Sequence, residues 1–211
     1  MRYKKILFDF DGTLADTMDD NFLAWQRAFE RYEVRIERGD YFHLEGLKLL
    51  KVAEVIGKKY SLPSEHYPRI VELKNKFYLE NNSFRFYEGV NEMIEKLYDG
   101  GTQLALVTAS PRSKLEKTVP KEFLSKFKCV VSGDDCERGK PYPDPYLKAI
   151  RQLGEKPENC IGVENAPLGV ESVKSAGVYC IAITTTLDES YFAHADKIVR
   201  NHSQLSLELF S

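Results

Sequence analysis

The sequence predicts an α/β protein with a parallel β-sheet and one inserted, all-helical segment. Short continuous apolar runs recur along the chain, as in strands covered on both faces, and segments with helical periodicity separate them. After the first run, no further strand-like run occurs until Leu104, and the chain between has only helical patterns. We therefore expect an α/β core formed by residues 1–16 and 87–211 and a helical domain over residues 17–86.

The predicted strands each end at a polar residue or a turn. They are Lys5–Phe8 before Asp9, Leu104–Val107 before Thr108, Cys129–Val131 before Ser132, Ile161–Val163 before Glu164 and Cys180–Ile183 before Thr184, with a short further run at Lys197–Val199. In open parallel sheets, ligands bind at the carboxyl ends of the strands. Any one of these turns alone is explained as an ordinary polar turn. Together, however, they bring carboxylate and hydroxyl side chains to the same edge of the sheet, which favours a shared binding site.

Helical periodicity predicts the elements between the strands. In the core the patterns cover Val90–Tyr98, Tyr146–Leu153 and Ala166–Val173, each followed by a glycine, and Asp144 is the predicted N-cap of the second. In the inserted segment they cover Phe22–Tyr32, Leu47–Ile56 and Ile70–Leu79. We interpret the aromatic stripe of the first inserted helix as packing.

Composition and charge exclude several classes of partner. The chain has 211 residues, of which 43% are hydrophobic and 29% charged, so disorder is not expected. With 30 Lys and Arg against 32 Asp and Glu, the net charge is −2, which gives no global field for capturing nucleic acid. No apolar run is long enough to cross a bilayer. We expect neither a nucleic-acid nor a membrane partner.

The cysteines favour a reducing compartment. Cys129, Cys136, Cys160 and Cys180 form no CxxC pair, and three of them lie inside apolar runs, which is typical of buried free thiols. The N-terminus lacks the apolar segment of a secretory signal. The sequence therefore predicts a cytoplasmic protein, with a disulfide framework as the weaker alternative.

The sharpest chemical pattern is the segment DFDGTLAD at residues 9–16. Asp9 and Asp11 are two residues apart at the end of an apolar strand, so both project the same way if the strand continues. Two such carboxylates repel each other and need a cation or a proton. Magnesium meets that need because it takes hard oxygen ligands and keeps water molecules that a phosphate can displace. A turn that merely ends the strand is the alternative.

This segment resembles, position by position, the first motif of the haloacid dehalogenase superfamily. The resemblance implies that Asp9 is the nucleophile, which forms an aspartyl-phosphate, and that Asp11 is the general acid/base. A carboxylate nucleophile divides one difficult displacement into two easier ones. The dehalogenases and phosphonatases of the superfamily lack an aspartate at the second position, so cleavage of a carbon–halogen bond is disfavoured.

Three further segments resemble the remaining motifs of the family, in order. The first implies phosphate binding by Thr108 and Ala109, although a threonine turn alone is more simply a cap. The second, GKPYPD, makes Lys140 the phosphate-neutralising lysine, held in a frame of two prolines. The third contains Glu164 and Asn165, which complete the implied magnesium shell of Asp9, Asp11, Glu164 and Asn165.

Asn165 departs from the family, which usually has a second acid here. An amide oxygen still ligates magnesium but attracts it less strongly. Glu164 would then carry more of the binding, or Asp134 or Asp135 would help. Asn165 is also a plausible N-cap.

The resemblance spans the chain, and the relatives it indicates are the β-phosphoglucomutase-like phosphatases. It implies a Rossmann-like sheet of strand order 5-4-1-2-3 and a helical cap that excludes water from the site. Where the mutases have a histidine and an arginine, this chain has Asn21 and Leu49. We interpret Lys48, Lys51 and Lys74 in the cap as solvated helix lysines, with binding of an acidic substrate as the alternative.

The sequence therefore predicts a Mg²⁺-dependent phosphatase that acts on a small phosphorylated metabolite, of sugar phosphate or phosphoglycolate type, through an aspartyl-phosphate. A β-phosphoglucomutase-type phosphomutase is the alternative. A non-catalytic sensor of phosphate ligands, suggested only by Asn165, is the weakest alternative. No oligomeric state is predicted.

Overall fold

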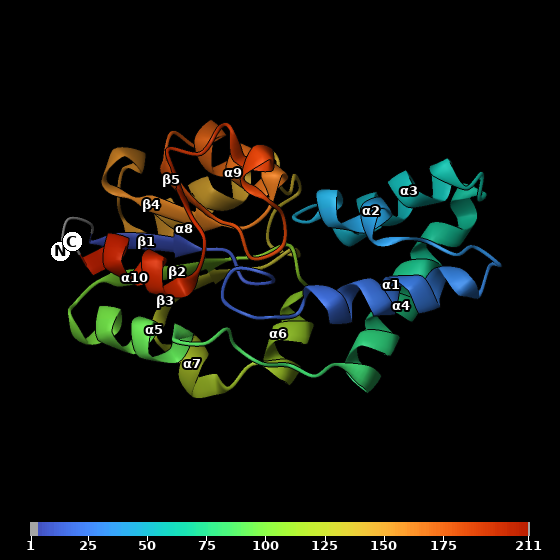
Figure 1. The fold of residues 1–211 in the computed structure, drawn as a ribbon, viewed down its shortest axis with the longest axis horizontal. Coiled ribbons are helices and arrows are strands. Elements are labelled where there is room, and N and C mark those ends of the chain that lie inside the picture. The colour runs from blue at the N-terminus through green and yellow to red at the C-terminus, as the bar shows by residue number, and fades with distance from the viewer. Residues whose placement is uncertain (1–3, 211) are drawn as a thin grey trace.

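A computed structural model describes residues 4–210 and shows a six-stranded parallel sheet with helices on both faces (Figure 1). The strands are β1 Lys5–Phe8, β2 Gln103–Val107, β3 Phe127–Val131, β4 Ile161–Glu164, β5 Tyr179–Ile183 and β6 Lys197–Val199. Their spatial order is β3-β2-β1-β4-β5-β6. The predicted α/β class and the order 5-4-1-2-3 are confirmed, and β6 extends the sheet beyond β5.

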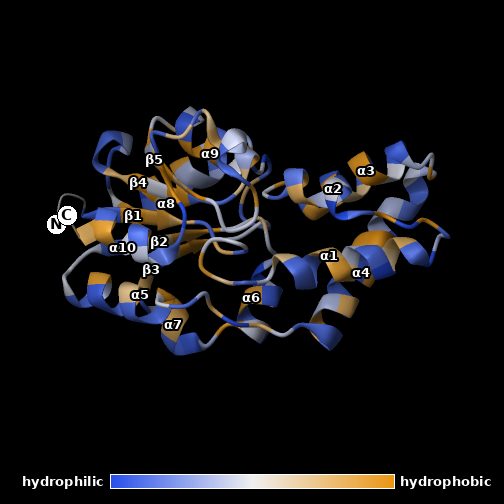
Figure 2. Ribbon diagram, in the orientation of Figure 1, coloured by the Kyte–Doolittle hydropathy of each residue, from blue (hydrophilic) through white to orange (hydrophobic). Residues whose placement is uncertain are grey.

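Alternate residues of the strands point to two separate apolar layers. Ile6 and Phe8 pack on one face, while Leu7 packs on the other. The first face is covered by α5 Val90–Asp99, α6 Arg112–Thr118, α7 Lys121–Ser125 and α10 His202–Phe210, and the second by α8 Asp144–Leu153 and α9 Pro167–Ser175. Figure 2 shows the apolar strands between helices whose outer surfaces are polar. The near-continuous apolar strands are explained by this double cover.

The chain between β1 and α5 forms four α-helices that lie beyond the carboxyl ends of the strands (Figure 1). They are α1 Met18–Glu30, α2 Arg38–Tyr41, α3 Leu49–Lys59 and α4 Tyr67–Asn81, with short 3-10 turns at Phe42–Leu44 and Ser64–His66. Their apolar side chains form a third core of their own, and the aromatic residues of α1 belong to it. This separate core supports the proposed helical domain at residues 17–86, whose boundaries stay a prediction.

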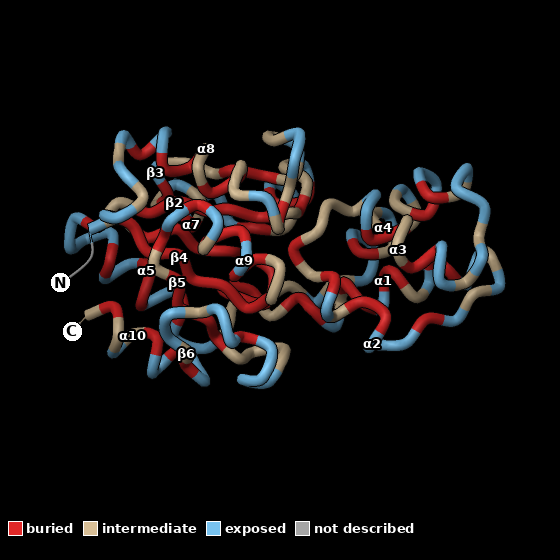
Figure 3. The backbone as a smooth tube through the Cα atoms, turned by 90° about the horizontal axis from the view of Figure 1, so that it is seen from above, coloured by how far each residue is buried: buried red, intermediate tan, exposed pale blue. Residues whose placement is uncertain are grey.

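The two connections to the inserted helices run side by side. Ala15 forms an isolated bridge with Phe86, and Asp16 pairs with Arg85 at 2.5 Å. The inserted helices are therefore joined to the core by two chain segments that lie side by side. Figure 3 shows buried residues both in the core and in the inserted helices.

Two smaller expectations are resolved by the structure. Asp144 is the first residue of α8, its side chain makes no cap, and it pairs with Arg138 instead, so the N-cap prediction is wrong by one position. All four cysteines are free thiols, and Cys160 and Cys180 are buried.

Within residues 4–210 no helix combines the length and the apolar composition needed to cross a bilayer.

Gly162 in β4 allows α9 to pack closely against the sheet, because a Cβ there would lie 2.6 Å from a methyl group of Val173. We expect Gly162→Ala to lower the free energy of unfolding by about 1–3 kcal/mol, measured by urea denaturation, since strand and helix must separate. Gly39→Ala in α2 is the matched control, because no atom lies within 4 Å of its added Cβ. Equal stability losses in the two variants would contradict this account of the packing.

Candidate active site

A buried lysine joins the carboxyl ends of three neighbouring strands. Lys140 Nζ lies 2.6 Å from Asp9 Oδ1 after β1, 2.6 Å from Glu164 Oε1 in β4, and 3.1 Å from the carbonyl oxygen of Val107 in β2. Burial lowers the pKa of Lys140, but Asp9 and Glu164 outweigh it and hold that pKa above its usual value. The structure therefore brings the predicted Asp9, Lys140 and Glu164 together, with the lysine charged.

Glu164 is held in place from both sides of its carboxylate. Oε1 also accepts the hydroxyl of Tyr146 from α8 at 2.7 Å, and Oε2 accepts the backbone N–H of Asn165 at 3.2 Å. A Cβ at Gly169 in α9 would lie about 2.1 Å from this carboxylate, so only glycine lets the helix cover it. Glu164 therefore forms an ion pair with Lys140 in this structure. Its predicted role as a metal ligand stays a prediction.

Asp9 is buried in surroundings that disfavour its charge. Burial and the neighbouring Glu164 raise the pKa of Asp9 well above its usual value, and Lys140 opposes them. An additional positive charge beside Asp9 would keep it ionised.

The Asn165 side chain lies beside two oxygens of the first motif. In one orientation of its amide, Oδ1 accepts the Thr13 hydroxyl at 2.9 Å and also lies 3.2 Å from Asp9 Oδ2 and 3.1 Å from the carbonyl oxygen of Asp11, two further acceptors. In the other orientation the amide NH₂ donates to both oxygens. Gly12, at φ +82°, makes this approach possible, because a Cβ there would lie 2.1 Å from the amide nitrogen.

The converging oxygens fit magnesium. Ligands of an octahedral ion with bonds of about 2.1 Å lie about 3 Å apart along each edge, which is close to the distances from Asn165 Oδ1 to Asp9 Oδ2 and to the Asp11 carbonyl oxygen in the first orientation. Among residues 4–210 there is no group of three or more His, Cys, Asp or Glu side chains suited to a metal ion. The candidate set instead combines the Asp9 carboxylate, the Asn165 amide and the Asp11 carbonyl.

Asp11 has an environment opposite to that of Asp9. Its Oδ1 accepts from Thr17 at 2.6 Å, Lys114 at 2.8 Å and Asn21 at 3.1 Å, and its Oδ2 accepts from Ser110 at 2.6 Å. Burial raises the pKa of Asp11, but the charge of Lys114 and these hydrogen bonds outweigh it and hold the pKa well below its usual value. In this conformation Asp11 is a fixed, ionised base.

The sequence did not identify Lys114, and it assigned two other lysines wrongly. Lys114 in α6 is not among the residues that the sequence patterns singled out, and the only signal for it is its place one helical turn after Ser110. Lys74, predicted to be solvated, is 1% exposed and donates to Asn21 Oδ1 at 2.8 Å, because α4 packs against α1. Lys48 is half-buried and donates to the carbonyl oxygen of Cys136. Lys51 is exposed as predicted, paired with Glu54.

The remaining predicted residues lie around this centre. Thr108 is buried, and its Oγ1 accepts the backbone N–H of Ser110 at 3.0 Å, which is the cap that its turn suggested. The phosphate-binding roles of Thr108 and Ala109 stay predictions. Asp134 accepts the backbone N–H of Arg112, and Asp135 accepts from Ser132 and Arg112, so neither is engaged with Asp9 or Asn165.

A small cavity separates the core from the inserted helices. The core supplies Asp11, Ala109 and Ser110, and the inserted helices and their loops supply Asn21, Tyr41, Leu44, Glu45, Gly46, Leu47, Leu49, Val52 and Lys74. Its volume of about 20 Å³ is roughly enough for one water molecule. The inserted helices therefore close over Asp11 in this conformation.

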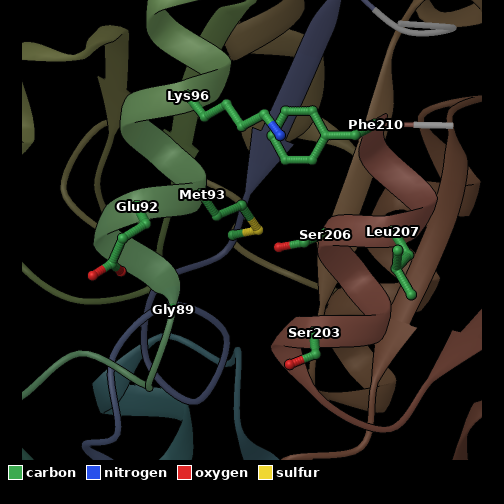
Figure 4. Close-up of a pocket in the computed structure, with 8 residues that line it drawn as sticks. All are labelled: Gly89, Glu92, Met93, Lys96, Ser203, Ser206, Leu207 and Phe210. Atoms are coloured by element: carbon green, nitrogen blue, oxygen red, sulfur yellow. The ribbon is translucent and has the colours of Figure 1, made fainter.

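A larger hollow of about 520 Å³ lies elsewhere, between α5 and α10 (Figure 4). Lys96 extends over the ring of Phe210 at 4.3 Å on its wall. It contains none of the side chains gathered around Asp9 and Asp11, so it is not part of this site.

Asp9, Asp11 and a buried lysine lie at the carboxyl ends of a parallel, Rossmann-like sheet, and the comparisons place the chain among hydrolases of this fold. The chain belongs to the haloacid dehalogenase-like hydrolase family, whose profile matches residues 6–183. It is 28% identical over 209 residues to validoxylamine A 7'-phosphate phosphatase of Streptomyces hygroscopicus subsp. limoneus, covering 96% of each chain. It is 26% identical over 215 residues to β-phosphoglucomutase of Bacillus subtilis, covering 98% of this chain and 93% of the relative.

The fold is also that of solved β-phosphoglucomutases. The crystal structure of the Clostridium difficile protein superimposes with a TM-score of 0.85 at 23% identity, covering 99% of this chain and 95% of that one. The predicted family is confirmed, and with its phosphatase relatives it identifies the chain as a hydrolase of phosphoric monoesters.

Two buried tyrosines near the site provide a stability test. Tyr146 donates to Glu164, whereas within residues 4–210 the Tyr78 hydroxyl has no hydrogen-bond partner. We expect Tyr146→Phe to lower the free energy of unfolding in urea by about 1–3 kcal/mol, because a buried carboxylate loses a donor. Tyr78→Phe, the same chemical change, should be neutral or stabilising, and a loss as large as that of Tyr146→Phe would contradict the assignment.

Proposed function

We propose that this chain is a Mg²⁺-dependent phosphatase that hydrolyses a small phosphomonoester through an aspartyl-phosphate on Asp9. The observation that carries the proposal is the position of the Asp9 carboxylate. One oxygen is fixed by Lys140, and the other lies 3.2 Å from the side-chain amide of Asn165. A nucleophile held in this way needs little reorganisation to attack phosphorus.

The first step forms the covalent intermediate. A carboxylate oxygen of Asp9 attacks phosphorus, the ester P–O bond breaks, and Asp11 gives its proton to the departing alkoxide, which leaves as the alcohol. Because the contacts of Asp11 here favour its ionised form, it must leave Lys114 and Asn21 to carry that proton. Thr108, Ala109 and Lys140 are the proposed contacts of the phosphoryl oxygens.

The second step releases phosphate. Water attacks the phosphorus of the aspartyl-phosphate, Asp11 takes a proton from that water, and the bond between phosphorus and Asp9 breaks. Inorganic phosphate leaves and the Asp9 carboxylate is restored. The ionised, hydrogen-bonded state of Asp11 suits this step directly.

Asp9, Asn165 and the Asp11 carbonyl would hold the magnesium ion, with Glu164 as a further proposed ligand. The ion would supply positive charge that keeps Asp9 ionised and offsets the charge of the phosphate. A cytoplasmic location is proposed on the basis of the free thiols.

A phosphomutase is the second candidate, favoured by the mutase relative. Two positions support the phosphatase instead. Asn21, in place of the mutase histidine, donates to Asp11, and the apolar Leu49 lines the cavity where an arginine would hold a second phosphate. Conversion of a hexose 1-phosphate to the 6-phosphate without phosphate release would favour the mutase. Phosphate binding without turnover of any ester would favour a sensor.

We expect Asp9→Asn to reduce the hydrolysis of p-nitrophenyl phosphate in magnesium to the background rate, because an amide does not act as the nucleophile. Phosphate release and nitrophenolate absorbance measure this. The control is Asp99→Asn at the exposed end of α5, which should keep wild-type turnover. A fully active Asp9→Asn variant would remove the proposal.

We expect Asn165→Asp to lower the half-saturating magnesium concentration by roughly five- to tenfold, because one more negative charge faces the ion. Activity titrations and the rise in Tm with added Mg²⁺ both measure it. Asn91→Asp on the exposed face of α5 is the matched control. Equal magnesium requirements in the wild type and Asn165→Asp would show that Asn165 is not a ligand.

A further inference from the structure

The closed cavity contains a buried ammonium group without a counter-charge. Lys74 lines the cavity and is 1% exposed, and its Nζ donates to Asn21 Oδ1 at 2.8 Å. In the described part of the chain Lys74 takes part in no ion pair, and its other neighbours are the rings of Trp25 and Tyr78. An ammonium group has three donors, so Lys74 can still donate to a guest that enters when the inserted helices move away from the core.

The same cavity contains a carboxylate without a counter-charge. Glu45 follows the 3-10 turn of the inserted segment and is half-buried, and its Oε2 accepts the Tyr41 hydroxyl at 2.5 Å. Glu45 takes part in no ion pair among residues 4–210, and Oε1 can still accept from a guest.

The other charges at this cavity are already balanced. Asp11 is paired with Lys114, and both side chains are 5% exposed. Lys74 and Glu45 take part in no ion pair among residues 4–210, although each acts on the other through space. Burial and Lys114 lower the pKa of Lys74 to about 7, against Asp11 and Glu45. Burial and Asp11 raise the pKa of Glu45 to about 7, against Tyr41, Lys114 and Lys74.

These two groups restrict the chemistry of a guest. A carboxylate in the guest would suit Lys74 but would be repelled by Glu45. An ammonium group would suit Glu45 but would be repelled by Lys74. A hydroxyl accepts from an ammonium and donates to a carboxylate, so it satisfies both without a charge. The leucines on the rest of the wall suit the C–H groups of such a molecule.

We propose that Lys74 and Glu45 determine specificity by selecting the phosphomonoester of a neutral, hydroxylated alcohol over esters of carboxylated or aminated alcohols. The inference rests on the proposed function, because Asp11, which would protonate the leaving alcohol, lines the same cavity. Of the two predicted substrate types, it favours the sugar or polyol phosphate over phosphoglycolate.

Three two-carbon esters of similar size test the inference: 2-hydroxyethyl phosphate, phosphoglycolate and O-phosphoethanolamine. We expect the wild type to hydrolyse the first with a kcat/KM at least about tenfold above that of either charged ester. Each variant is compared with the wild type as a ratio of kcat/KM values between two esters, so the intrinsic reactivities of the esters cancel.

Glu45→Gln removes the charge and keeps an acceptor. It should raise the phosphoglycolate to 2-hydroxyethyl phosphate ratio by about tenfold. Lys74→Gln should raise the ratio for O-phosphoethanolamine in the same way, with Tm reporting its folding because Lys74 is buried. The controls are Glu54→Gln in α3 and Lys76→Gln in α4, two side chains in exposed ion pairs, which should leave both ratios unchanged.

The outcomes separate this inference from the proposed function. A wild type that hydrolyses p-nitrophenyl phosphate but prefers phosphoglycolate overturns the inference alone, as does a ratio that Glu45→Gln changes by less than about twofold. A wild type that releases phosphate from none of the four esters overturns the proposed function and the inference with it. A tenfold change in Glu45→Gln that is absent from Glu54→Gln supports the inference, even if Lys74→Gln does not fold.

Discussion

The ammonium group of Lys140, buried between two carboxylates, is the interaction on which the rest of the site depends. A buried ion pair is tolerated only when every charge and hydrogen-bonding atom has a partner. Asp9, Glu164 and the Val107 carbonyl supply those partners, and each comes from a different one of three adjacent strands. The strand order therefore has an electrostatic consequence, since only the order β2-β1-β4 brings these three groups to one lysine.

The two aspartates of the first motif occupy opposite electrostatic environments although they are two residues apart. Burial and Glu164 raise the pKa of Asp9. Burial also raises the pKa of Asp11, but the charge of Lys114 and the hydrogen bonds from Lys114, Ser110 and Thr17 outweigh it and lower that pKa. Environments that separate the pKa values of two neighbouring carboxyls are typical of sites in which the groups have different roles. The separation agrees with a nucleophile at Asp9 and an acid/base group at Asp11.

Sequence reasoning predicted the elements with local signals and missed the groups placed by tertiary packing. The apolar runs predicted the strands. The spacing of Asp9 and Asp11, with the resemblance of the segment around Lys140 to a family motif, suggested their shared site. Lys74 was predicted to be a solvated helix lysine and Lys114 was not identified, because the helical pattern of one segment does not show which helix packs on which face. Their burial follows from the packing of α4 against α1 and α6, between residues far apart in the chain.

The contacts of Asp11 also link the position of the inserted helices to its charge. Thr17 and Asn21, which donate to Asp11 Oδ1, lie at the start of the inserted segment, whereas Lys114 and Ser110 belong to the core. All four donors favour a carboxylate over a carboxylic acid. A protonated Asp11 would weaken its bonds to Thr17 and Asn21, and an outward movement of α1 would remove donors that keep Asp11 ionised. The closure of the cavity and the ionised state of Asp11 therefore stabilise each other, and the loss of either weakens the other.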